Sequence, residues 1–110
     1  MPNAIKLIVY PTQDIEQAKT FYNSFLDTTP YVDSPYYVGY KVGDLEIGLD
    51  PSSKLGPITY IDVNDINASL QAIVKAGGEV VQESKEVGGG LVIAQVKDTS
   101  GNIVGLRQES

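Results

Sequence analysis

The stretch DIEQAKTFY, residues 14–22, decides the fold, and DINAS, residues 65–69, repeats its opening in the second half of the chain. Each copy starts with an Asp, whose side chain accepts hydrogen bonds from the first backbone N–H groups of a helix. Apolar residues then recur at helical spacing, which predicts helices over Ile15–Leu26 and Ile66–Ala76. The stripes that we expect to pack on a sheet are Ile15, Ala18, Phe21, Tyr22 and Phe25 in the first helix, and Ile66, Leu70, Ile73 and Val74 in the second.

Short runs rich in Ile, Val and Tyr surround both helices and predict strands. In the first half they are Ile5–Pro11, a short strand near Tyr31 and Val32, Tyr36–Val42 and Leu45–Asp50; in the second they are Ile58–Val63, Glu79–Val87, Leu91–Lys97 and Ile103–Arg107. Each half is therefore predicted as β-α-β-β-β, and Ile47-Gly48-Leu49 is matched late in the second half by Val104-Gly105-Leu106. Together these similarities favour an internal duplication, with a single domain without duplication as the alternative.

Composition excludes several classes of protein. The 110 residues contain no Cys and no His, which removes disulfides, thiolate or imidazole metal sites and Ser-His-Asp chemistry. The net charge of −6 argues against nucleic acid and anionic membranes as partners. The sequence contains no apolar run long enough for a signal peptide or a membrane span, so we expect a cytoplasmic protein.

Three motifs together resemble the vicinal oxygen chelate superfamily, which includes glyoxalase I, extradiol dioxygenases and bleomycin-resistance proteins. They are the Asp14–Tyr22 segment, Val63-Asn64-Asp65-Ile66, and the turn Asp98-Thr99-Ser100-Gly101-Asn102 before the last strand. The resemblance implies an α+β fold in which two βαβββ modules form a cupped mixed sheet with a central cleft and helices on the convex side. It covers residues 1–110 as a single domain, with module one at 1–52 and module two at 56–110.

In metal-dependent members of this superfamily, four side chains on the concave faces hold a divalent ion. Carried over by position, the ligand sites fall on Leu7, Gly48, Ile58 and Gly105. None of these side chains has an oxygen or nitrogen to donate, and such ions require those donors. We therefore expect no metal and no other cofactor.

Strand alternation predicts which side chains line the cleft. If Gly43-Asp44 is a two-residue turn, then Lys41 lies opposite Glu46, and Tyr37 opposite Asp50, on the cleft face. The candidate ligand-binding residues are Tyr37, Glu46, Asp50, Tyr60, Asp62 and Arg107, with Lys41, Gln95 and Lys97 on the same face and Val38, Tyr40, Val42, Val92, Ala94 and Val96 on the helix side.

Each candidate also has a structural alternative. Lys41 and Glu46 can form a cross-strand ion pair on a solvated face. Asp50 precedes Pro51 and can shape a turn, while Tyr37 and Tyr60 can be packing residues. Asp62 can meet a cationic ligand or pair with Arg107.

The favoured function is metal-free binding of a small molecule, with the acids and tyrosines suggesting a cationic or aromatic ligand. One alternative is an enzyme, either a glyoxalase-like lyase or a metal-independent isomerase that uses Tyr60, Asp62 or Glu46 as acid or base. Another is an interaction module in a larger assembly. We also expect a homodimer, as is common in the superfamily, with the Ile5–Pro11 edge as the contact.

Overall fold

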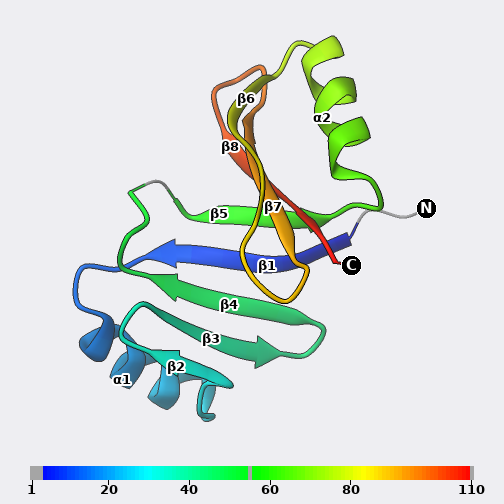
Figure 1. Cartoon of the computed structure of the whole chain (residues 1–110). Helices are drawn as coiled ribbons and strands as arrows, with labels where there is room; N and C mark the ends of the chain where they lie inside the picture. The colour runs from blue at the N-terminus through cyan, green and yellow to red at the C-terminus, as the bar shows by residue number, and fades with distance from the viewer. Residues whose placement is uncertain (1–3, 55, 110) are drawn as a thin grey trace. The chain divides into compact units, whose positions relative to one another are not determined.

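The computed structural model describes residues 4–54 and 56–109, and its elements confirm the predicted α+β fold of two βαβββ modules. The first module contains β1 (Ala4–Pro11), α1 (Ile15–Leu26), β2 (Val32–Ser34), β3 (Tyr37–Val42) and β4 (Leu45–Asp50). The second contains β5 (Ile58–Asp62), α2 (Ile66–Lys75), β6 (Glu79–Glu86), β7 (Val92–Lys97) and β8 (Ile103–Gln108). The structure divides into two compact units, one spanning Lys6–Ile58 and the other, here called the C-terminal unit, formed by the residues up to Ile5 together with those from Thr59 onward. Figure 1 shows both.

Both modules order their strands in the same way. In module one β2 pairs with β3 and β3 with β4, both antiparallel, and β4 pairs with β1 in parallel. In module two the equivalent order is β6-β7-β8-β5, with β8 and β5 parallel. The repeated topology supports the duplication. The cupped shape and the cleft stay predictions.

Both helices begin as the sequence predicts. Asp14 accepts a hydrogen bond from the Gln17 backbone N–H at 3.1 Å, and Asp65 accepts one from the Ala68 N–H at 3.1 Å. Satisfying these N–H groups stabilises a helix by about 1 kcal/mol. None of the described helices is both long and apolar enough to cross a membrane.

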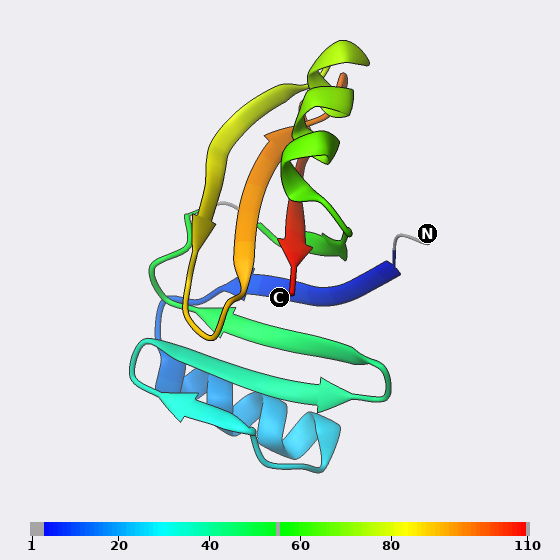
Figure 2. The same ribbon diagram turned by 45° about the vertical axis from the view of Figure 1, so that its right-hand side comes forward.

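Each helix packs on one face of its own sheet, as Figure 2 shows. The module-one core holds Val38, Tyr40 and Leu49, with α1 residues Ile15, Ala18, Tyr22 and Leu26 against them. The module-two core holds Ile66, Leu70, Ala94, Val96 and Leu106, with Ile73 and Val92 packed beside them. Within residues 4–54 and 56–109, the opposite face of each sheet carries no helix of its own module.

Some predicted core positions were wrong. Phe21 and Phe25 are 61% and 69% exposed, because the helical stripe that meets the sheet follows Ala18, Tyr22 and Leu26, and the two rings lie beside it. They stack on each other instead, with centroids 5.8 Å apart. Val74 and Val42 are also exposed. Val74 is the next-to-last residue of α2, and Val42 lies next to the hairpin turn.

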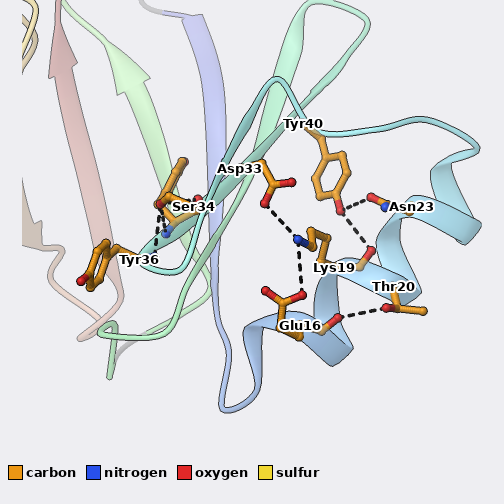
Figure 3. A network of polar contacts seen from close by, with 9 residues as sticks. Glu16, Lys19, Thr20, Asn23, Asp33, Ser34, Tyr36 and Tyr40 are labelled. Atoms are coloured by element: carbon orange, nitrogen blue, oxygen red, sulfur yellow. Dashed lines mark hydrogen bonds and ion pairs between the residues drawn. The ribbon is translucent and has the colours of Figure 1, made fainter.

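Polar contacts fix strand β2 to helix α1 (Figure 3). The Lys19 ammonium donates to Asp33 at 3.0 Å and lies 3.4 Å from Glu16. The buried Tyr40 hydroxyl donates to the Asn23 side chain at 2.6 Å and lies 3.2 Å from the Lys19 carbonyl. These groups join three elements on the helix side of the module-one sheet.

Candidate functional site

The helix-free face of module one carries the candidates of the first half, and we call it the module-one face. Lys41 is the strand partner of Glu46, Gly39 of Gly48, and Val38 of Leu49, which confirms the predicted register. Cross-strand partners share a face, and Val38 and Leu49 are in the helix-side core. Side chains that alternate with these two core residues along the same strands therefore point to the helix-free side. They are Tyr37, Lys41, Glu46 and Asp50.

Tyr31 is the residue of this face that sequence reasoning missed. Its hydroxyl donates to the Glu46 carboxylate, and the Lys41 ammonium lies 4.9 Å from the centre of its ring. Tyr31 thus contacts both charged residues that were expected to pair with each other. It precedes β2, where alternation along a strand gives no guide to direction. Its backbone N–H bond to the Gly39 carbonyl, at 2.9 Å, places it beside a residue without a side chain.

Asp50 has the turn-shaping contacts that were one of its two interpretations. Its carboxylate accepts hydrogen bonds from the Ser52 N–H at 2.9 Å and the Ser52 hydroxyl at 2.7 Å. This carboxylate is engaged at the end of β4, which leaves Glu46 as the acid of the module-one face that is not tied to that turn.

The helix-free face of module two, the module-two face, is built in the same way. Tyr60 is the strand partner of Gly105 and Asp62 of Arg107, while Gln95 is the partner of Gly105 on the other side. Leu106, Ala94 and Val96 belong to the helix-side core, so the alternate positions point away from α2. Gln95 donates its side-chain N–H to the Tyr60 hydroxyl at 3.1 Å.

Arg107 lies between two carboxylates on this face. Its Nη1 is 3.4 Å from Asp62 Oδ1, and its Nη2 donates to Glu109 Oε2 at 3.0 Å. The pairing of Asp62 with Arg107 was the alternative to a ligand contact. Glu109, which follows the last predicted strand, was not singled out by the sequence.

The four positions that the resemblance assigns to metal ligands carry side chains that do not suit a metal ion. Leu7, Ile58, Gly48 and Gly105 offer no donor atoms. Both glycines are also covered by rings: a Cβ built on Gly48 would lie 2.6 Å from Tyr37 Cζ, and one on Gly105 would lie 2.7 Å from Tyr60 Cγ. In the described ranges, no group of three or more Asp or Glu residues is arranged to hold an ion.

A surface hollow lies away from these faces, at the end of α1. It is lined by Thr20, Asn23, Ser24, Asp27, Thr28 and Thr29. The hollow is shallow and open and contains none of the sequence candidates, so we do not assign it the site.

Solved structures of similar fold span the whole chain. Hypothetical protein BH1468 from Bacillus halodurans C-125 has a TM-score of 0.81 at 17% identity, covering 100% of this chain and 96% of its own. Methylmalonyl-CoA epimerase from Mycobacterium tuberculosis has a TM-score of 0.78 at 17% identity, covering 97% and 88%. A glyoxalase/bleomycin resistance protein/dioxygenase superfamily member from Vibrio splendidus 12B01 has a TM-score of 0.73 at 17% identity. The match covers 99% of this chain and 98% of that protein.

No curated protein matches the chain significantly. The sequence itself matches the glyoxalase/bleomycin resistance protein/dioxygenase superfamily over residues 4–106, which is nearly its full length. Two βαβββ modules and three solved structures of the same fold agree with that match. The chain belongs to the glyoxalase/bleomycin resistance protein/dioxygenase superfamily.

Proposed function

We propose that this chain binds a small aromatic, cationic molecule on the module-one face, without a metal ion. The observation that supports the proposal is the Tyr37 ring that covers Gly48, one of the positions that the resemblance assigns to metal ligands. The partly exposed Tyr37 ring offers flat apolar surface where metal-dependent relatives are expected to offer charged donors, whereas Tyr60, which covers Gly105, is only 6% exposed. Tyrosine suits such a site because it has an apolar body and a polar tip.

The charges on the module-one face favour a cation. The Lys41 ammonium lies against the Tyr31 ring, and the same tyrosine directs its hydroxyl to Glu46. A ligand ammonium can take the place of either contact, because it is attracted both by the carboxylate and by the ring face. Exposed cation–ring contacts contribute about 0.5–1 kcal/mol each, so several are needed for micromolar binding.

A thermal-shift screen with three matched aromatics tests the proposal. Phenethylamine, phenethyl alcohol and hydrocinnamate differ mainly in charge. We expect phenethylamine to stabilise the protein most, and Glu46→Gln or Tyr31→Phe to reduce that effect. Glu83→Gln, which removes the same charge from an exposed position on β6, is the matched control and should leave it unchanged. Equal shifts in wild type and Glu46→Gln would contradict the proposal.

A metal-independent isomerase is the second candidate, and one contact favours it. The Tyr31 hydroxyl and the Glu46 carboxylate are joined by a hydrogen bond, which places a possible acid beside a possible base. Such an enzyme would exchange a proton next to a carbonyl group with solvent. Deuterium uptake into small carbonyl compounds that stops in Glu46→Gln would support this activity over binding alone.

A further inference from the structure

Arg107 is the only arginine in the sequence, and it is placed in the interior of the C-terminal unit. Its side chain is only 9% exposed, although guanidinium groups are rarely buried unless fully paired. Burying a charge costs free energy, and hydrogen-bond and ion-pair partners are what offset that cost.

The hydrogen bonds of Arg107 are incomplete among the described residues. Nη2 donates to Glu109, while Nη1 meets Asp62 at 3.4 Å. The Nε–H group is buried and has no hydrogen-bond partner in the part of the chain that the structure describes. A buried donor without an acceptor is uncommon in folded proteins and requires an explanation.

The orphaned Nε and the adjacent Nη2 form one edge of the guanidinium fork. That edge matches the two oxygens of a carboxylate, which arginine binds through two parallel N–H···O bonds. Glu109 uses only the Nη2 half of the edge, and its own side chain is 64% exposed. It is therefore a partial and readily displaced occupant, whereas Asp62 lies on the other side of the fork at Nη1.

We propose that the Nε–Nη2 edge of Arg107 binds the carboxylate of a small ligand, and that Glu109 occupies this place when the ligand is absent. One carboxylate replaces another, so the local charge is unchanged while Nε gains an acceptor. This site goes beyond the function proposed above, because it takes an anionic group and is built only from the C-terminal unit.

The single arginine makes the site directly observable. In the ¹⁵N-labelled full chain, the Arg107 Nε–H gives a unique NMR signal that needs no assignment. We expect hydrocinnamate to move this proton downfield in a saturable way. Phenethyl alcohol, or sodium chloride at the same ionic strength, should not. The absence of a saturable shift with hydrocinnamate, in both wild type and Glu109→Gln, would overturn the proposal.

Two variants separate a binding edge from an ordinary ion pair. Glu109→Gln removes the competitor, so hydrocinnamate should bind roughly two- to fivefold more tightly, as expected for one partly exposed charge contact. Glu79→Gln removes an exposed carboxylate of the same unit and should leave the affinity unchanged. Equal affinities in wild type and Glu109→Gln would show that Glu109 does not hold the ligand's place.

Arg107→Lys keeps the charge but loses the fork, and we expect it to weaken hydrocinnamate binding about tenfold or more. If this variant fails to fold, the Glu109→Gln comparison decides alone. The readout is also separate from that of the proposed function. Loss of phenethylamine binding in Glu46→Gln concerns the module-one face, and the Arg107 signal reports only its own surroundings.

Discussion

The ring of Tyr60 lies directly on Gly105, its partner on the adjacent parallel strand. A methyl group at position 105 would come within 2.7 Å of Cγ and still closer to the next ring carbons. Because Cγ is the ring atom nearest to the backbone of Tyr60, the contact is relieved only by a change in χ1 or a shift of the strand, and not by a small movement of the ring tip. On Gly48, by contrast, the closest atoms belong to the far end of the Tyr37 side chain.

This difference predicts unequal costs for two alanine substitutions. Gly105→Ala should lower the free energy of unfolding by about 1–3 kcal/mol, the usual cost of overpacking. Gly48→Ala should cost under about 1 kcal/mol, because Tyr37 can shift its tip. Urea unfolding measures both. In a Tyr60→Ala background the Gly105→Ala cost should largely vanish; an unchanged cost would mean that the ring is not what excludes the methyl group.

Tyr40 should make stability fall at alkaline pH. Burial raises the pKa of Tyr40 above its ordinary value of 10.0. Its contribution is therefore complete below about pH 10 and is lost as the pH rises towards the folded-state pKa, because the unfolded chain releases the proton first. Tyr40→Phe should flatten this alkaline decline and should cost about 1 kcal/mol at neutral pH through the lost bond to Asn23. Thermal unfolding from pH 8 to 11 tests it, with the 80% exposed Tyr36 changed to Phe as control.

Asp98 should produce the opposite dependence in acid. Hydrogen bonds from the Asn102 side chain and backbone, and then from the Ser100 N–H, lower the pKa of Asp98 below its ordinary 3.8. Its stabilisation is present above that value and disappears as the pH falls through the folded-state pKa. The difference in urea midpoint between wild type and Asp98→Asn should therefore shrink from pH 7 to pH 3. Asp44→Asn, in an exposed turn, is the matched control.

Divalent metals should not bind stoichiometrically. After exposure to zinc, nickel, manganese or iron(II) and dialysis, elemental analysis should find less than one ion per chain, since the four expected positions lack donor atoms. One ion retained per chain, and released only by a chelator, would contradict this prediction.

A homodimer is the last expectation. Light scattering at tens of micromolar should give about twice the 11.8 kDa chain mass. If the Ile5–Pro11 segment is the contact, Ile5→Glu should shift the protein towards monomer, because Ile5 is half-exposed and apolar. A monomer in wild type would exclude the dimer, and an unchanged dimer in Ile5→Glu would move the contact elsewhere.

The fold was largely predictable because its signals are local. Helix caps at Asp14 and Asp65, helical spacing and the two-residue turn at Gly43 each act over a few residues, and they placed helix α1 and strand β4 with the observed bounds. The hairpin turn also set the register that pairs Lys41 with Glu46.

The site contacts were less predictable because they depend on side-chain direction. Alternation placed Tyr37 and Tyr60 on the correct faces, yet it has no rule for Tyr31 before β2 or for Glu109 after β8. The same limit explains Phe21 and Phe25: a small rotation of the helix decides which part of a broad apolar stripe meets the sheet.

The two ring-covered glycines also mark a difference between the two halves. Gly105 is covered by Tyr60 of the parallel neighbour, whereas the equivalent partner of Gly48 is Val9. Gly48 is covered instead by Tyr37 of the antiparallel neighbour, two residues before its partner Gly39; the equivalent place in module two, two residues before Gln95, holds Ile93. The halves reached the same local arrangement from different strands. The ring that covers the glycine therefore comes from the antiparallel neighbour in one half and from the parallel neighbour in the other, so the two coverings are not copies of one another.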